Sequence, residues 1–440
     1  MKMNKTNRYK NALLLAASSL FLVSNFAWAE DLVQIYTLAK ENDPQFKSDK
    51  AALDAAYESV KITRGNFMPD VNLSAGYAEN DTDTTNLDDG GTTTYSINLK
   101  QPLYRSDFNA SHSRNKNFVL QAEADFATAE QNLIIRVATQ YFSVLGAQDN
   151  YEFSEAELKA NIRQLEQTKQ RFEVGLVAIT DVHEAQARHD LSVAQKIEAE
   201  NRLNNELESM RAITNKYLTD FSSLKSDEVL KSAAALVPPE PNDIDHWTQR
   251  ALEQNKFLLS SQYFVAQSRD GVNLQKSAHK PTLDFTASSS RSDSDSGTYD
   301  STSVGIQFGM NLFNGGTTSA SVRQAEHYLT QAVEAMEDAR RSTQRNVRNS
   351  FLSVRSSVSR VRALKQAVIS SESRLKASEA GFDVGTRTTV DVLDARRELY
   401  NSQREYARAR YDYILEKLRL EQFVGDLNEE DVTFINNWLQ

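Results

Sequence analysis

Four short stretches of the chain alternate between apolar and small polar residues, which is the pattern of a β-strand with two different faces. In one of them, Val304, Ile306 and Phe308 alternate with glycine or polar residues. The four stretches lie near residues 70–80, 92–102, 281–290 and 301–312. Each is close to the ~9–11 residues of a transmembrane strand. A soluble hairpin also fits this alternation, and the small residues on the second face favour the membrane.

The strands are expected to pair as two hairpins around acidic, polar loops. One loop is Asn80–Gly91 and the other is Arg291–Asp300. Neither loop has the glycine and glutamate spacing of an EF-hand, so we interpret both as solvated loops without a metal.

Between these strands, apolar residues recur at spacings of three and four, which predicts coiled-coil helices. Leu158, Ile162 and Leu165 follow this pattern, as do Leu364, Val368 and Leu375 in the second half of the chain. No proline occurs in residues 103–237 or 282–440, so very long helices are expected over 105–215 and 317–425. Gly146 lies inside the first of these spans and marks either a break or a point of close packing.

The chain contains an internal duplication. Residues 172–185 match residues 382–395 at a constant offset of 210, with six of fourteen positions identical. Each half is therefore expected to contain a helix, two strands, a long helix, a tight turn and a returning helix. This predicts a first repeat over residues 30–235 and a second over 236–440, which ends in a short C-terminal segment, with prolines 238, 239 and 241 at the junction.

The first 29 residues have the features of a signal peptide. Four basic residues precede an apolar stretch from Ala12 to Val23, and Ala27-Trp28-Ala29 forms a cleavage site. We therefore expect an exported protein whose mature chain begins at Glu30.

Composition narrows the class of protein further. The chain has no cysteine, which excludes disulfides, cysteine-ligated metals and thiol catalysis. Its net charge of -10 argues against a nucleic-acid partner. Its mean hydropathy of -0.55 argues against a helical membrane protein. No catalytic motif and no histidine spacing for a metal occurs, so we expect neither enzyme activity nor a cofactor.

The number of strands limits the assembly. Four strands cannot close a barrel, because the smallest membrane barrels have about eight. Several chains must therefore share one barrel, with eight strands from two chains or twelve from three.

The whole mature chain resembles the TolC family of trimeric outer-membrane efflux channels. The resemblance rests on the repeat, on Gln101-Pro102-Leu103 and on the long motifs 171–182 and 384–395. It implies a mainly α-helical protein with a β-barrel portion: four transmembrane strands per protomer form a shared 12-stranded barrel in the outer membrane of a Gram-negative bacterium. A coiled-coil helical barrel then extends through the periplasm.

The same resemblance implies function and partners. It predicts a passive channel, a homotrimer in outer-membrane lipid, closed at its periplasmic end. A periplasmic adaptor (membrane fusion) protein and an inner-membrane transporter of the RND, ABC or MFS type would open it. Drugs, detergents and exported proteins would be its cargo. The alternative from the residues alone is a periplasmic coiled-coil adaptor or scaffold.

Two glycines mark the turns at the ends of the long helices. Gly175 and Gly385 suit the left-handed conformation that ends a helix. The resemblance implies that these turns also contact the adaptor. The expected docking residues are Gly175, Leu176, Val177, Gly385 and Thr386.

Asp391 and Asp394 lie three residues apart, hence on one face at the start of a helix. Aspartate in this position caps backbone amides, and Asp181 and Glu184 repeat the pair in the first half. The resemblance implies that Asp391 and Asp394 also form acidic rings in the pore, which attract cations.

The resemblance also implies a lock that holds the pore shut, in which Arg387 contacts Thr180 and Asp181 of a neighbouring coil. Family members carry a tyrosine where this chain has Phe382. Phenylalanine cannot donate a hydrogen bond to Asp181, so Arg387 is expected to carry more of the closure.

Overall fold

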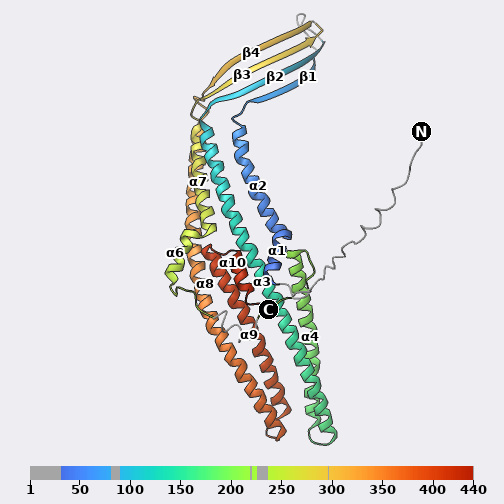
Figure 1. Cartoon of the computed structure of the whole chain (residues 1–440). Coiled ribbons are helices and arrows are strands. Elements are labelled where there is room, and N and C mark those ends of the chain that lie inside the picture. Colours follow the sequence, from blue (N-terminus) through green and yellow to red (C-terminus); the bar gives the residue numbers. More distant parts are fainter. Residues whose placement is uncertain (1–30, 81–89, 219–220, 225–235, 296, 440) are drawn as a thin grey trace, which may run out of the picture.

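A computed structural model of the protein describes residues 31–80, 90–218, 221–224, 236–295 and 297–439. The molecule is elongated, with a small sheet at one end and helices along the remaining length (Figure 1). The predicted signal peptide, residues 1–29, lies outside the described residues.

The same order of elements occurs twice along the chain. The first half contains α1 (Leu32–Asn42), α2 (Pro44–Gly65), β1 (Asp70–Asn80), β2 (Gly90–Arg105), α3 (Ser106–Glu173) and α4 (Ile179–Thr214). The second half contains α6 (Ile244–Gln254), α7 (Lys256–Ser277), β3 (Thr282–Ser294), β4 (Gly297–Gly309), α8 (Thr317–Asp383), α9 (Thr389–Val424) and α10 (Glu429–Asn436).

Two very long helices determine the length of the molecule. Helix α3 has 68 residues and α8 has 67. At ~1.5 Å per residue, each spans about 100 Å. Helix α3 passes through Gly146 without a break, and a Cβ there would lie 3.8 Å from the Tyr411 ring, an ordinary packing distance. Among the described helices, none is long and apolar enough to cross a bilayer.

The sheet is antiparallel, with the strand order β1-β2-β3-β4. Its register places hydroxyl groups opposite each other on one face. There Ser74 lies 2.7 Å from Ser96, and Ser288 lies 2.8 Å from Ser303, between side-chain oxygens. The other face carries exposed apolar side chains, namely Val71, Leu73, Tyr95, Ile97, Val304, Ile306 and Phe308.

The second hairpin differs from the predicted one at both ends. Strands β3 and β4 pair as far as Ser294 and Gly297, so most of the predicted loop Arg291–Asp300 is strand. Arg291 lies opposite Asp300 and donates two hydrogen bonds of 2.8 Å to its carboxylate. This cross-strand pair explains why a polar stretch continues the ladder instead of turning. At the other end β4 stops at Gly309, so predicted residues 310–312 lie beyond the strand.

The hydrophobic core lies at mid-length, where the short helices pack on the long ones (Figure 1). Its largest fully buried side chains include Leu32, Ile35, Leu133 and Tyr141. The hydroxyl of Tyr141 donates a 2.6 Å hydrogen bond to the carbonyl of Ser222, so this buried polar group is satisfied. The core therefore joins α1, α3 and the chain beyond α4.

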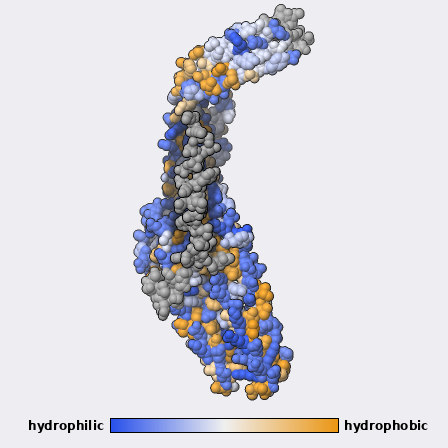
Figure 2. All heavy atoms as spheres, turned by 45° about the vertical axis from the view of Figure 1, so that its right-hand side comes forward, coloured by the Kyte–Doolittle hydropathy of each residue, from blue (hydrophilic) through white to orange (hydrophobic). Residues whose placement is uncertain are grey.

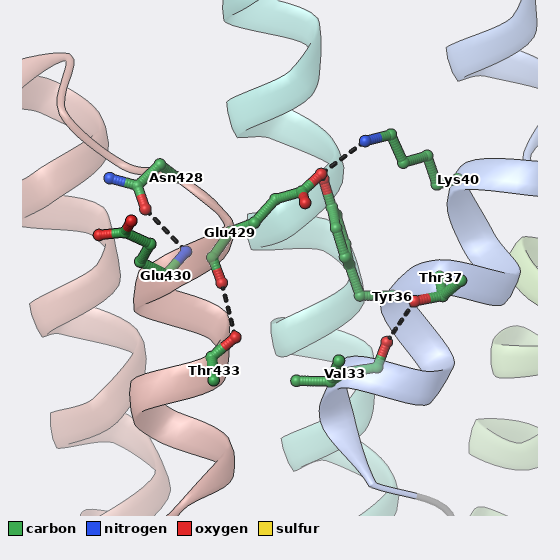
Figure 3. Close-up of polar contacts among 8 residues, drawn as sticks. All are labelled: Val33, Tyr36, Thr37, Lys40, Asn428, Glu429, Glu430 and Thr433. Carbon is green, nitrogen blue, oxygen red and sulfur yellow. Dashed lines mark hydrogen bonds and ion pairs between the residues drawn. The ribbon is translucent and has the colours of Figure 1, made fainter.

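The first and last helices of the described chain are tied together beside this core (Figure 3). The Glu429 carboxylate accepts hydrogen bonds from Tyr36, at 3.2 Å, and from Lys40, at 2.5 Å. The Lys40 ammonium beside Glu429 lowers the pKa of that carboxyl. Asn428 caps α10 by accepting a 2.7 Å hydrogen bond from the Glu430 amide. These contacts join α1, in the first half of the chain, to α10, at the end of the second half, and so form one unit at mid-length.

We expect Ile35→Ala to destabilise this unit by about 2–5 kcal/mol, because it leaves a cavity at a fully buried position. The midpoint of urea unfolding, followed by circular dichroism, measures the effect. Ile62→Ala is the matched control, since Ile62 is 64% exposed. An equal loss of stability in the two variants would contradict the assignment of the core.

Candidate functional site: the tips of the two helical hairpins

The two long helices end in the same turn. Gly175 has φ 80° and Gly385 has φ 79°, and this left-handed region favours glycine. In the first turn the Leu176 amide donates to the Arg171 carbonyl at 2.8 Å. In the second, the Thr386 amide donates to the Gly381 carbonyl at 2.8 Å. Both are Schellman turns, which satisfy the last carbonyls of a helix and reverse the chain.

Apolar side chains are exposed beside both glycines. Val174 is 70% exposed, Leu176 is 73% exposed and Val384 is 75% exposed. Of the other predicted docking residues, Thr386 is exposed and Val177 is half-buried. Figure 2 shows apolar side chains at the ends of the helical part, far from the sheet. The tips therefore present small apolar surfaces on hydrogen-bonded turns.

A capping box starts helix α9. The Asp391 amide donates to the Thr388 hydroxyl at 3.2 Å, and the Asp391 carboxylate accepts from the Thr388 amide at 2.8 Å. The backbone hydrogen bond from Thr388 lowers the pKa of Asp391 below its ordinary value, and the Thr388 hydroxyl lowers it further. The predicted capping role of Asp391 is thus present in the structure, with Thr388 as the N-cap residue.

Asp394 has different partners. Its Oδ1 lies 3.1 Å from Nη2 of Arg188 on α4, and 3.4 Å from Nη2 of Arg397 on its own helix. The Arg188 contact crosses from one helical hairpin to the other. The two aspartates that the sequence groups together therefore differ: among the described residues of one chain, Asp394 has a partner in the other hairpin and Asp391 has none.

The N-terminus of α4 has fewer capping hydrogen bonds than that of α9. The Asp181 carboxylate accepts a 3.2 Å hydrogen bond from the Ala178 amide. Ala178 stands where the second repeat has Thr388, so no hydroxyl completes the box. Thr180 is exposed beside Asp181.

Arg387 lies in the turn between α8 and α9 and contacts both helices of its own hairpin. Its Nη1 lies 3.8 Å from Oδ1 of Asp391, and its stem lies across Gly381, where a Cβ would come within 2.7 Å of it. Among the residues that the structure describes in one chain, it makes no ion pair with Asp181.

Phe382 contacts an arginine of the other hairpin. The guanidinium of Arg171 lies 4.4 Å from the centre of the Phe382 ring, and its Nη2 lies 3.5 Å from Oδ1 of Asp383. This cation–π contact needs only the ring face, so it does not depend on the missing hydroxyl.

Sequence reasoning missed the roles of Arg171 and Arg188. The one local signal was that Arg188 follows Glu184 by four residues, a spacing that favours an ion pair on a helix. Arg188 lies 3.0 Å from Glu184, as that spacing indicates, and also 3.1 Å from Asp394, a second partner that spacing does not reveal.

The site offers no metal centre within the described part of the chain, where no cluster of three histidine or acidic residues could hold an ion. Its chemistry is that of charged and apolar side chains arranged around helix ends.

Comparison with known proteins supports a specific class. The family model described as "Outer membrane efflux protein" matches residues 35–216 and 247–426, one match in each half. Outer membrane protein TolC of Vibrio cholerae is 40% identical over 435 residues, which cover 97% of this chain and 98% of that protein. Outer membrane protein TolC of Escherichia coli K12 is 35% identical, over 97% of this chain and 88% of that protein.

Solved structures share the fold. The CmeC outer membrane channel of Campylobacter jejuni superposes with a TM-score of 0.77 at 17% identity, over 92% of this chain and 90% of its own. VceC of Vibrio cholerae superposes with a TM-score of 0.73 at 17% identity, over 90% and 99%.

The chain therefore belongs to the outer membrane efflux protein family. It is an outer-membrane efflux channel whose helical part extends into the periplasm, as the sequence predicted. The family consists of channels, and the alternative of a periplasmic adaptor or scaffold receives no support.

Proposed function

We propose that three copies of the chain form one channel with a shared 12-stranded barrel. The observation that carries this proposal is the four-stranded sheet, in which the edge strands β1 and β4 each pair on one side only with the described residues of the chain. Its apolar face is exposed, and an open sheet edge is not tolerated in lipid. Three sheets of four strands make a barrel of twelve, and the long helices continue from it as a periplasmic tube.

The mass of the detergent-solubilised particle tests this assembly. We expect the mass of three mature chains after subtraction of bound detergent, measured by light scattering. A monomer that retains its helical content would contradict the shared barrel.

We propose that the cargo includes drugs, detergents and exported proteins. Support for exported proteins comes from the alkaline protease secretion protein AprF of Pseudomonas aeruginosa, which is 28% identical over 96% of this chain and 90% of its own. An inner-membrane transporter of the RND, ABC or MFS type would deliver the cargo through a periplasmic adaptor protein. The channel itself supplies a path and no energy.

The adaptor would dock on the tips at Gly175, Leu176, Val177, Gly385 and Thr386. The supporting observation is that both turns expose aliphatic side chains on rigid Schellman geometry. Exposed apolar groups held in a fixed conformation lose little entropy on binding.

At the constriction, Asp391 and Asp394 from three chains would form acidic rings that select cations. Both side chains are partly exposed at the start of α9, and the capping box holds Asp391 in one conformation. A ring of fixed carboxylates lowers the energy of a cation in a narrow pore.

Replacement of both acids, Asp391→Asn with Asp394→Asn, should reduce the cation preference because the ring loses its charge at nearly constant volume. Reversal potentials in planar bilayers under a potassium chloride gradient measure it. Asp338→Asn is the control, since Asp338 is an exposed acid on α8, far from the tip. Unchanged selectivity in the double variant would exclude the ring.

We propose that Arg387 closes the pore by contacting Thr180 and Asp181 of the neighbouring chain. The guanidinium is exposed, and Asp391 is its nearest acid at 3.8 Å, so a second acceptor can be added from outside the chain. Phe382 then serves this closure as the ring on which Arg171 rests.

Arg387→Ser should raise the resting conductance of the closed channel. Exposed ion pairs contribute ~0–1 kcal/mol, which corresponds to at most about a fivefold shift of the closed–open equilibrium per contact. Lys376→Ser, at an exposed cation of α8, should leave the conductance at the parent value. Equal conductance of Arg387→Ser and the parent channel would refute the lock.

A further inference from the structure

Near the tips, the side chain of Arg188 binds one acid in each of the two helical hairpins. Its Nε donates a 3.0 Å hydrogen bond to Glu184 on α4, and its Nη2 donates a 3.1 Å hydrogen bond to Asp394 on α9. Its side chain is 23% exposed. Charge-assisted hydrogen bonds are stronger than neutral ones, and removal of one partner from a partly buried pair leaves the other charge uncompensated.

The internal repeat explains why one arginine holds two acids. Glu184 and Asp394 occupy the same position in the two repeats, at the offset of 210 residues. The repeat equivalent of Arg188 is Glu398, an acid, so the arrangement occurs once per chain. The two equivalent helix starts are therefore joined through a single cation.

The two aspartates of the proposed ring respond differently to separation of the hairpins. The hydrogen bonds of Asp391 come from Thr388 in its own helix, and they remain when the hairpins part. Asp394 would lose Arg188 and keep only Arg397, which is 3.4 Å away and half exposed. The charge that Asp394 presents to the pore thus depends on contact between the hairpins.

A second arginine crosses between the hairpins in the same direction. Arg171 on α3 lies over Phe382 at 4.4 Å and contacts Asp383 at 3.5 Å, both on α8. In these two contacts the first hairpin supplies the cation and the second supplies the acid. Farther along the hairpins the direction reverses, because Arg404 on α9 lies 3.4 Å from Glu157 on α3.

We propose that Arg188 determines both the resting closure and the ion selectivity of the tip. It holds α4 against α9 within one protomer and neutralises Asp394 while the hairpins are in contact. Separation of the hairpins removes this cation and leaves Asp394 with Arg397 alone, so that it attracts cations more strongly in the widened pore. The selectivity part rests on the acidic ring proposed above, whereas the closure part does not.

Arg188→Gln in the full-length channel tests both parts in planar bilayers. We expect a severalfold higher resting conductance, because the hairpins lose their contact, and a stronger cation preference, because Asp394 loses its counter-charge. Only inserted channels conduct, so a variant that fails to fold cannot mimic this result.

Arg397→Gln is the matched control, because Arg397 pairs with the same acid at 3.4 Å from within α9. It should strengthen the cation preference while the resting conductance stays at the parent value. A conductance increase equal to that of Arg188→Gln would show that loss of charge, and not of the hairpin contact, opens the tip, and would overturn the proposal.

The double variant Arg188→Asp with Asp394→Arg swaps the two charges. It distinguishes the effect of the ion pair between the hairpins from the effect of either charge alone. We expect the low parent conductance to return, with a weakened cation preference because the ring now carries an arginine. Conductance as high as in Arg188→Gln would overturn the closure.

The outcomes also distinguish this inference from the proposed ring. If Arg188→Gln raises the conductance and leaves selectivity unchanged, the closure stands and the charge role fails. If neutralisation of Asp391 and Asp394 leaves selectivity unchanged, the ring itself fails. Parent values of both quantities in Arg188→Gln would refute both parts.

Discussion

The unpaired backbone groups at the two edges of the sheet are the constraint on which the rest of the structure depends. Strands β1 and β4 each have one free side, and the apolar face between them has no cover within the described chain. In hydrocarbon every unpaired amide or carbonyl costs several kcal/mol. The sheet is therefore stable in a membrane only when other copies complete a barrel. Because β2 continues directly into α3 at Ser106, closure of the proposed barrel would also arrange the long helices around a common axis.

At the opposite end, the same duplicated segment carries two different distributions of charge. Both turns use a left-handed glycine and both returning helices begin with an aspartate. The second helix has a complete capping box, whereas the first has Ala178 in place of the capping threonine. Arg188 then links the repeat-related acids Glu184 and Asp394. The two repeats are thus joined by an arginine that only the first of them has, since Glu398 stands at the equivalent position of the second.

Much of the fold was predictable from the chain. The period of two located all four strands, and the absence of proline with the three–four spacing located the long helices to within a few residues. The predicted loop at Arg291–Asp300 was wrong because polarity alone does not distinguish a turn from a strand whose charged residues pair across the ladder. Gly146 lies in a continuous helix, so of the two interpretations of this glycine the break was wrong.

The sequence by itself determined the local features: strand faces, helix extents, both glycine turns and the capping position of Asp391. Each depends on residues within a few positions of one another, so spacing is sufficient evidence. Only the tertiary structure decided which acids meet which arginines across the hairpins. Arg188 and Asp394 are 206 positions apart, and nothing in local periodicity couples them. Their contact follows from how α4 packs against α9, because that packing places one guanidinium within hydrogen-bonding distance of two carboxylates.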